Sequence, residues 1–425
     1  MSCLKWGRRQ LNNRKYEKVK QYNQMNTNSF FTHLACSECG NMFDKNTVQT
    51  FCPDCIKPLS AIYAIPSGGL DKSILLHRPK TMWRYREMLP VENDNNIVTL
   101  GEGFTPLLKM ENLGRKLGLV NLFLKDESSN PTSSFKARGL SMAVSKAKEY
   151  GISAVAIPTA GNAGSAMSAY AAKANMGAHV FMPKMTPSVF KLDCTYFGAK
   201  VTIIEGSIRD CAKALAAQNI GKTVNGQVVR PWFDVSTLKE PYRLEGKKTM
   251  GYEIAEQLDW QLPDVIIYPA GGGTGLIGIW KAFQEMMLLG WITHIPTRMV
   301  CVQAQGCSPI VDAFERGLEE ALPVDKPQET IANGLRVPAP FGDKWMLKVL
   351  KDSHGTAIRI SDKEMLEGTH EMAHTEGVFV APEGAATWIA FKKLLADGWI
   401  LSHQSVVLLN TGSAYKYIEN LEAFV

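Results

Sequence analysis

Residues 121–140 decide the fold, and they read Asn-Leu-Phe-Leu-Lys-Asp-Glu-Ser-Ser-Asn-Pro-Thr-Ser-Ser-Phe-Lys-Ala-Arg-Gly-Leu. The apolar residues 122–124 predict a short strand, Asn130-Pro131 predicts a loop, and Lys136 falls at the start of a predicted helix. A cation at a helix N-terminus opposes the helix dipole by about 0.3–1 kcal/mol. We therefore hypothesise that Lys136 serves as a nucleophilic amine with a lowered pKa. The alternative is a solvated lysine at the start of a helix.

The composition is that of an ordinary globular protein with more than one domain. The chain has 425 residues, of which 45% are hydrophobic and 21% charged, so it can bury a large core. Its formal net charge is +6, but residues 1–20 carry seven basic residues and one acidic residue, which give 7 − 1 = +6 by themselves. The other residues are electrically balanced, and this balance argues against a nucleic-acid-binding surface.

The sequence shows no sign of a membrane or secretory destination. No apolar run approaches the ~18 residues of a membrane span, and the N-terminus lacks the apolar core of a signal peptide. We expect a cytoplasmic protein that binds neither nucleic acid nor membrane. Residues 1–30 are expected to form a basic, disordered tail.

Four of the nine cysteines form two C-x2-C pairs, Cys36-Ser-Glu-Cys39 and Cys52-Pro-Asp-Cys55, which are separated by 12 residues. Such pairs predict a zinc-ribbon-like module over residues 31–60, with a structural Zn2+ held by four thiolates. Disulfide bonds are the alternative, but the other five cysteines leave an odd count. A module this small cannot build a sufficient core, so metal binding would supply its folding energy.

From residue 60 onward, strand and helix patterns alternate, which predicts an α/β fold with mostly parallel sheets covered by helices on both faces. The stretch 219–235 is predicted to be a loop or hairpin. The predicted strands span residues 122–124, 154–158, 179–183, 200–204, 264–269, 299–304 and 405–410.

Three turns that follow predicted strands carry groups suited to binding a ligand. Four glycines within residues 271–275 precede a helix, and their exposed backbone N–H groups suit a phosphate. No Gly-Lys-Ser/Thr follows, so the turn is not a nucleotide P-loop. Asn162 and Thr411 occupy the other two turns, where each could bind a ligand or simply cap the next helix.

These motifs, in this order, resemble the fold type II pyridoxal-phosphate enzymes, the tryptophan synthase beta-like family. Within that family, Gly-Glu-Gly-Phe-Thr-Pro-Leu at 101–107, Tyr-Arg-Leu-Glu-Gly-Lys-Lys-Thr at 242–249 and the Thr-Gly pair at 411–412 are most similar to threonine synthases. The similarity spans residues 97–418. It implies two doubly wound parallel-sheet domains after the N-terminal zinc-ribbon-like module: a large cofactor-binding domain from residues 61–144 and 241–425, and a small mobile domain from residues 145–240. It also implies a homodimer.

The resemblance assigns a role to each candidate residue. Lys136 would bond covalently to pyridoxal 5'-phosphate and act as acid and base, Phe135 would pack on the cofactor ring, and Asn162 would bind the ring hydroxyl. Thr411 would face the pyridine nitrogen. The cofactor phosphate would be held by Gly271, Gly272, Gly273, Thr274 and Gly275.

The implied substrate is a small phosphorylated amino acid. O-phospho-L-homoserine and water would give L-threonine and phosphate by γ-elimination and β-hydration. Arg243 would bind the substrate phosphate, and the alternative for this residue is a surface ion pair with Glu240 or Glu245. Further substrate-binding candidates are Ser133, Ser134 and Thr159.

Three departures from the family pattern leave the substrate open. Ala137 follows Lys136 where the family usually has aspartate, Ala163 replaces a common hydroxyl residue, and the segment 233–239 lacks the usual asparagine. One alternative function is a β-replacement on O-phospho-L-serine. A deaminating lyase that acts on serine or threonine is another, and the third is a non-enzymatic zinc-ribbon protein that binds nucleic acid.

Overall fold

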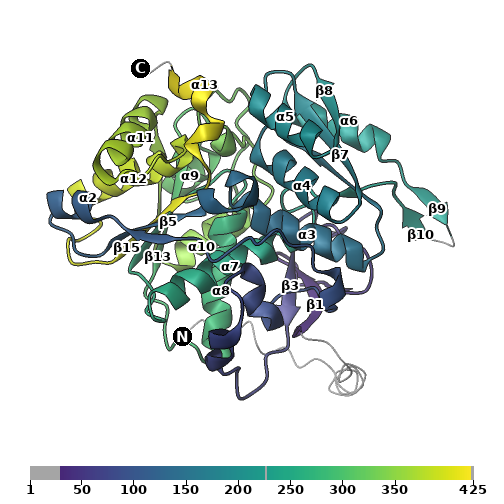
Figure 1. Ribbon diagram of the computed structural model, residues 1–425, viewed down its shortest axis with the longest axis horizontal. Helices are drawn as coiled ribbons and strands as arrows, with labels where there is room; N and C mark the ends of the chain where they lie inside the picture. The colour runs from purple at the N-terminus through teal and green to yellow at the C-terminus, as the bar shows by residue number, and fades with distance from the viewer. Residues whose placement is uncertain (1–28, 225–226, 423–425) are drawn as a thin grey trace.

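The structure is a computed structural model that describes residues 29–224 and 227–422. The predicted basic tail therefore lies almost entirely outside the described residues. Within them the chain forms three main sheets and the helices that cover them (Figure 1). No helix in these ranges is both long and apolar enough to cross a bilayer.

The N-terminal module is a three-stranded antiparallel sheet in the order β2-β1-β3. Its strands are β1 (Phe31–Cys36), β2 (Met42–Asp44) and β3 (Leu59–Tyr63). Cys36 ends β1 and Cys39 lies in the turn that follows it, whereas Cys52 and Cys55 lie in the loop between β2 and β3. Short 3-10 helices then lead toward the main body, namely η1 (Lys72–His77), η2 (Met82–Met88) and η3 (Asp94–Asn96).

The larger main sheet has six strands in the order β14-β13-β12-β15-β5-β4, and all pairs are parallel except β4 with β5. These strands are β4 (Leu107–Lys109), β5 (Leu122–Asp126), β12 (Val265–Pro269), β13 (Arg298–Ala304), β14 (Thr356–Ile360) and β15 (Val406–Asn410).

Helices cover both faces of this sheet, because its strands are apolar on both sides. In β12, Ile266 and Tyr268 belong to one buried cluster and Val265 and Ile267 to another. The first cluster includes α7 (Tyr242–Gln257), α8 (Thr274–Leu289), α9 (Pro309–Glu315) and α10 (Asp343–Asp352). The second includes α2 (Glu111–Lys116), α11 (Asp362–Glu376) and α12 (Pro382–Ala396).

The smaller main sheet is wholly parallel, in the order β11-β6-β7-β8. Its helices again divide between two faces, with α3 and α4 on one and α6 on the other. The elements are β6 (Ala154–Pro158), β7 (Gly177–Pro183), β8 (Lys200–Ile204), β11 (Phe233–Asp234), α3 (Lys136–Glu149), α4 (Asn162–Lys173), α5 (Ser188–Tyr196) and α6 (Ile208–Gln218). The predicted hairpin is present as β9 (Lys222–Val224) and β10 (Gln227–Val229).

The predicted α/β class and the mostly parallel sheets are therefore confirmed, and the cysteine cluster of the N-terminal module suggests the predicted zinc-ribbon-like type. The small sheet lies within the predicted range 145–240, and the division into separately moving domains stays a prediction. Four elements between the glycine-rich turn at residues 271–275 and the Thr-Gly turn at 411–412 were not predicted from the sequence. They are α9, α10, β14 and α11.

Helices α3 and α7 cross at unusually short range in the middle of the molecule. An ideal Cβ on Gly139 would lie 2.9 Å from the carbonyl oxygen of Arg243, and one on Gly246 would clash with the carbonyl group of Arg138. Glycine at both positions therefore lets the two backbones approach. This explains the glycine that interrupts the predicted helix after Lys136.

We expect Gly246→Ala to lower the free energy of unfolding by about 1–3 kcal/mol, because the added methyl group overpacks the crossing. Urea denaturation measures the change. Gly68→Ala is the matched control, since a Cβ there has no atom within 4 Å, and it should change stability by less than about 0.5 kcal/mol. Equal effects of the two substitutions would contradict the close packing.

Candidate active site

Lys136 is delivered by a loop with a strained backbone. After β5 come two short turns, η4 (Glu127–Ser129) and η5 (Pro131–Ser133), and α3 begins at Lys136. Thr132 and Ser133 both adopt positive φ, 59° and 57°, a conformation that is costly for a β-branched residue such as threonine. Strain of this kind persists only where surrounding contacts hold it in place.

Those contacts come from the turn that follows β15, at residues 411–413. The N–H of Phe135 donates to the carbonyl of Thr411 at 3.1 Å, and the N–H of Ser413 donates to the carbonyl of Ser133 at 3.1 Å. Ser134 and Gly412 form a β-bridge between these bonds. The predicted lysine loop and the predicted Thr-Gly turn thus lie side by side, because β5 and β15 are parallel neighbours.

Asn162, the first residue of α4, lies beside the turn that contains Gly412. Its Nδ2 lies 3.5 Å from the hydroxyl of Tyr417, and an ideal Cβ on Gly412 would lie 3.5 Å from the same nitrogen. Its Oδ1 is buried and has no hydrogen-bond partner among the described residues. The side chain is therefore held near the lysine loop with one polar atom left for a ligand.

The glycine-rich turn connects β12 to α8 and requires its glycines. Gly273 has a φ of 77°, and a Cβ there would clash with Met346 of α10. A Cβ on Gly275 would clash with the hydroxyl of Tyr268. The turn therefore presents bare backbone at the N-terminus of α8, where the helix dipole favours an anion.

Helix α7 contributes two buried cations, Arg243 and Lys247, beside the lysine loop. Gly139 faces both of them: an ideal Cβ there would lie 3.3 Å from Cβ of Arg243 and 3.1 Å from Cε of Lys247. The Nζ atoms of Lys136 and Lys247 lie 4.3 and 4.4 Å from the ring centre of Phe135. Arg243 was predicted from the sequence, whereas Lys247 was not.

Arg243 is not in the surface ion pair that we considered for it. Its side chain is fully buried, and its guanidinium donates to the carbonyl of Val235 at 2.7 Å. Nε and Nη2 have no partner among the described residues. The Glu240 carboxylate accepts backbone N–H groups of Tyr242 and Arg243, whereas Glu245 pairs with Lys248 and Lys281.

The lack of counter-ions separates these two cations from the other buried ones. The described residues contain nine buried lysine and arginine side chains. Arg243 and Lys247 have no carboxylate oxygen within 4.0 Å there, whereas the other seven do. Burying an unpaired charge is costly, and burial lowers the pKa of both Arg243 and Lys247, so an anion bound beside them would stabilise their charged forms. The seven paired residues are Lys45, Arg84, Arg86, Lys125, Arg138, Lys146 and Lys248.

Burial and positive charge also change the acidity of the central lysine. Burial, followed by the repulsion of Arg243, lowers the pKa of Lys136 from 10.5 to about 7, and the attraction of Glu383 opposes this shift. Burial raises the pKa of Glu240 to about 7, so this carboxyl is only a partial counter-charge to its neighbours. The hypothesis of a lysine with a lowered pKa agrees with this environment.

Glu383 is a buried carboxyl of the site whose role the sequence did not indicate. It lies in the first turn of α12, and its Oε1 accepts hydrogen bonds from the N–H of Gly334 at 2.9 Å and the hydroxyl of Tyr417 at 2.8 Å. Its Oε2 is buried without a partner in the described ranges. Burial raises the pKa of Glu383. The proline before it signals a helix start, but no local pattern places this carboxyl beside Lys136.

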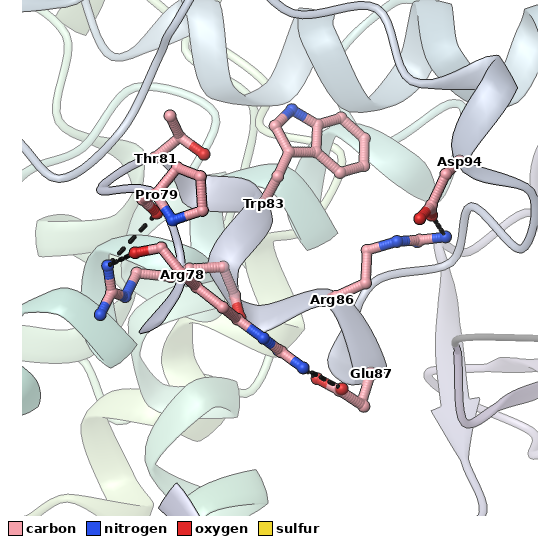
Figure 2. Close-up of a pocket in the computed structure, with 8 residues that line it drawn as sticks. Arg78, Pro79, Thr81, Trp83, Arg86, Glu87 and Asp94 are labelled. Carbon is pink, nitrogen blue, oxygen red and sulfur yellow. Dashed lines mark hydrogen bonds and ion pairs between the residues drawn. The ribbon is translucent and has the colours of Figure 1, made fainter. Parts of the chain in front are cut away.

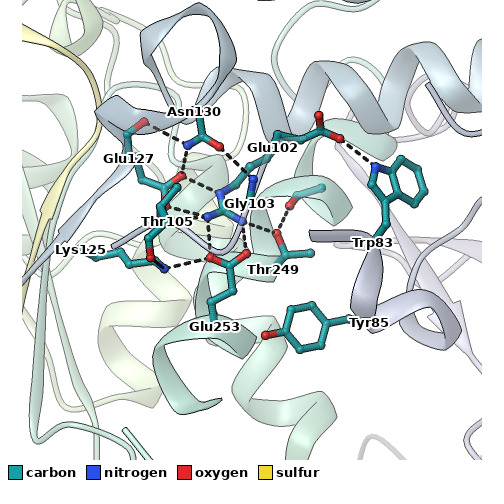
Figure 3. Close-up of polar contacts among 12 residues, drawn as sticks. Trp83, Tyr85, Glu102, Gly103, Thr105, Lys125, Glu127, Asn130, Thr249 and Glu253 are labelled. Carbon is teal, nitrogen blue, oxygen red and sulfur yellow. Dashed lines mark hydrogen bonds and ion pairs between the residues drawn. The ribbon is translucent and has the colours of Figure 1, made fainter. Parts of the chain in front are cut away.

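A buried network of ion pairs fixes the first turn of α3 (Figure 3). Arg138 donates to Glu127 at 2.6 Å and to Glu253 of α7 at 2.5 Å. Lys125 of β5 binds Glu253 at 2.9 Å, and Thr105 donates to Glu127 at 2.6 Å. Because this network ties β5, α3 and α7 together, it fixes the direction in which Lys136 leaves its helix.

The remaining predicted substrate residues lie near the same loop but differ in their bonding. The Ser134 hydroxyl is buried and has no partner among the described residues. Thr159 instead uses its hydroxyl within its own turn, where it lies 3.2 Å from the N–H of Gly161. Substrate binding by Ser133, Ser134 and Thr159 stays a prediction.

The polar atoms of this region that lack partners, among them Oδ1 of Asn162 and the hydroxyl of Ser134, fit pyridoxal phosphate. The group carries a phosphate, a ring hydroxyl, a ring nitrogen and a carbonyl carbon, and the region offers an anion-binding turn, an amide oxygen and hydroxyls. It also offers a lysine whose amine is partly neutral near pH 7. The fit rests on atoms that the described chain leaves without partners.

The four module cysteines converge on one point, as predicted for a metal site. Their sulfur atoms all lie within 4.8 Å of one another, and three pairs are separated by 3.3, 3.7 and 3.8 Å. Four thiolates around one zinc ion at about 2.3 Å would be separated by about 3.8 Å. All eight cysteines in the described residues are free of disulfide bonds.

A surface cavity of about 310 Å³ lies elsewhere, around η2 (Figure 2). It is lined by three arginines, but each pairs with a carboxylate: Arg78 with Glu87, Arg84 with Glu256, and Arg86 with Asp94. None of the candidate catalytic, cofactor-binding or substrate-binding residues lines it. The unpaired charges therefore distinguish the functional site from this cavity.

Comparison of the chain with known proteins identifies its family. Residues 98–412 match the model of the pyridoxal-phosphate dependent enzymes. The chain is 34% identical over 387 residues to the threonine synthase of Methanocaldococcus jannaschii, covering 90% of this chain and 92% of that one. It is 36% identical over 342 residues to the threonine synthase of Mycobacterium tuberculosis, covering 80% of this chain and 89% of its relative.

Solved structures share the fold at lower identity. A fungal L-serine ammonia-lyase from Rhizomucor miehei superposes with a TM-score of 0.62 at 22% identity, covering 75% of this chain and 96% of that chain. A processed threonine deaminase from Solanum lycopersicum gives 0.60 at 16% identity, covering 86% and 96%. The chain therefore belongs to the pyridoxal-phosphate-dependent enzymes, and within that family its sequence is similar to threonine synthases.

Proposed function

We propose that this enzyme converts O-phospho-L-homoserine and water to L-threonine and phosphate. The observation that carries the proposal is the buried, unpaired guanidinium of Arg243 beside Lys136. An amino acid without a phosphate would leave this charge uncompensated in the closed site. A phosphorylated one would accept hydrogen bonds from its Nε and Nη2 groups, in the two-pronged geometry that arginine offers to phosphate.

The family's cofactor would be held by the residues around the two turns. Lys136 would bond it covalently, the turn Gly271–Gly275 would bind its phosphate, Asn162 its ring hydroxyl, and Thr411 would face its ring nitrogen, with Phe135 against the ring. When bound there, pyridoxal phosphate supplies the electron sink that makes the substrate's α proton acidic.

The chain itself must move the protons. A pKa near 7 leaves the Lys136 amine partly neutral at physiological pH, so it can take the α proton from the substrate and return a proton later. Thr411 offers a neutral hydroxyl to the ring nitrogen instead of a carboxylate, so that nitrogen would stay largely unprotonated. More of the acid–base work would then fall on Lys136.

The other proposals are a structural zinc ion held by Cys36, Cys39, Cys52 and Cys55, a homodimeric assembly and a cytoplasmic location. The zinc proposal is supported by the convergence of the four sulfur atoms. The module contacts the main body through Tyr63, whose hydroxyl donates to Glu245 of α7 at 2.7 Å, and through Lys57, which pairs with Glu320 at 2.8 Å. A folded module would therefore support α7 from outside.

The decisive experiment incubates purified protein loaded with the cofactor with O-phospho-L-homoserine and measures threonine and phosphate. We expect equal amounts of both products. Phosphate release from O-phospho-L-serine, dependent on an added nucleophile and without release from O-phospho-L-homoserine, would replace our substrate with the β-replacement alternative.

Arg243→Gln tests the substrate assignment within the same assay. Removing hydrogen bonds to a charged group costs ~1.5–3 kcal/mol, so kcat/KM should fall by about 10- to 150-fold while the protein still binds the cofactor. Arg359→Gln is the control, because Arg359 pairs with Asp312 and Glu315 outside the site. An unchanged kcat/KM in Arg243→Gln would contradict its role in binding the substrate phosphate.

The lowered pKa of Lys136 has its own test. In protein stripped of cofactor, the reactivity of the Lys136 amine toward an amine-modifying reagent should rise with pH through about 7 and then level off, because the neutral form dominates above that pKa. Peptide mass spectrometry measures modification at each pH. The exposed Lys109 supplies the reference profile in the same digest, and parallel profiles for the two lysines would refute the shift.

The metal proposal predicts one zinc ion per chain in the purified protein. Cys39→Ser should remove the metal and destabilise the N-terminal module, because a structural zinc ion supplies folding energy. Elemental analysis of both proteins measures the content. Cys194→Ala is the matched control, since Cys194 is buried in α5 away from the cluster. Metal retained in Cys39→Ser at the wild-type level would exclude the four-cysteine site.

A further inference from the structure

Lys247 lies one helical turn after Arg243 on α7, between the lysine loop and the glycine-rich turn. Its Nζ donates to Oγ1 of Thr274 at 2.7 Å and lies 4.4 Å from the ring centre of Phe135. Gly139 of α3 leaves the room that its stem occupies. The side chain thus reaches from α7 to the first residue of α8, where the predicted phosphate-binding turn ends.

The amine of this lysine has few partners for a buried group, and burial together with the repulsion of Lys136 and Arg243 lowers its pKa. It is fully buried and has no carboxylate within 4.0 Å among the described residues, where its hydrogen bond to Thr274 is the one that it makes. The next residue, Lys248, is equally buried but pairs with Glu245 at 2.6 Å and Glu285 at 2.9 Å. Two neighbouring lysines on one helix therefore differ in that Lys247 lacks an anion.

The hydrogen bond to Thr274 indicates where that anion belongs. Because Nζ donates in this bond, the Thr274 hydroxyl accepts from Lys247, and its own hydrogen is left to donate to another acceptor. Thr274 also begins α8, whose N-terminus favours negative charge. Several hydrogen-bond donors therefore lie at the N-terminus of α8. They are the amine of Lys247, the hydroxyl of Thr274 and the backbone N–H groups of residues 271–273.

We propose that Lys247 is a specificity-determining residue that supplies the counter-charge for the cofactor's phosphate group, with the Thr274 hydroxyl as the link between them. The inference rests on the proposed binding of that phosphate by the glycine-rich turn. Arg243 has two free N–H donors of its own and is left for the substrate's phosphate. The two unpaired cations would thus serve two different phosphate groups.

The test compares the binding of pyridoxal phosphate with that of pyridoxal, which lacks the phosphate, in wild type, Lys247→Met and Lys351→Gln. Methionine preserves most of the side-chain volume and removes the charge. Lys351 is an exposed residue at the end of α10, so its substitution should change neither affinity. Dissociation constants are measured by titrating the absorbance of each vitamer bound to cofactor-free protein.

We expect Lys247→Met to weaken pyridoxal phosphate binding by about 10- to 100-fold and to change pyridoxal binding by less than about twofold. Thr274→Val should weaken pyridoxal phosphate binding too, and the double variant should be little worse than either single one, because the two groups act through one contact. Equal weakening of both vitamers, or no change in either, would overturn the inference.

Stability of the cofactor-free protein separates this role from a structural one. Replacing a buried amine that has no counter-ion by an apolar side chain should leave the unfolding midpoint of Lys247→Met unchanged or raise it, whereas loss of a structural lysine would lower it. If Lys247→Met fails to fold, Lys247→Gln and the 31P resonance of the bound cofactor provide the same comparison. A wild-type protein that binds neither vitamer would overturn the proposed function itself, a result distinct from failure of Lys247 alone.

Discussion

The position of Lys136 depends on a buried group of charges that is fully paired. Arg138 of α3 lies between Glu127, which follows β5, and Glu253 of α7, and Lys125 of β5 completes the group. Breaking such a pair leaves an uncompensated buried charge at a cost of about 3–5 kcal/mol. The network therefore holds the strained loop before Lys136 in one arrangement, and α3 can then cross α7 closely enough to bring Arg243 and Lys247 to the same site.

In the neighbouring candidate site, by contrast, the basic groups are not paired with carboxylates. Beside the neutralised network lie a lysine of lowered pKa and two cations without counter-ions. The folded chain tolerates this imbalance because its packing and ion pairs elsewhere over-determine the structure. Electrostatic preorganisation of this kind stabilises charge that arrives with the ligand, since the donors need no rearrangement when an anion binds. For the same reason we place the proposed chemistry in the deep polar site and not in the accessible cavity around η2.

Local sequence patterns predicted much of the architecture. Apolar runs and glycine punctuation located most strands of both parallel sheets, and the C-x2-C spacing located the cysteine cluster. Local patterns did not predict α10 and β14, which follow a region rich in proline and charged residues that shows no regular hydrophobic period. Glu383 and Lys247 were missed for a different reason. Each sits on a helix whose sequence gives no sign of the partner that approaches from a distant segment.

The sequence by itself determined the α/β class, the motifs of the family and the residue types that carry the chemistry, because these depend on short-range periodicity and on fixed spacings. Only the tertiary structure decided which charges are neutralised and which are not. Lys247 and Lys248 are adjacent in sequence, yet one faces the glycine-rich turn and the other faces two carboxylates. The two side chains point about 100° apart around the helix axis, and the hydroxyl of Thr274 and the carboxylate of Glu285 that distinguish their surroundings come from another helix.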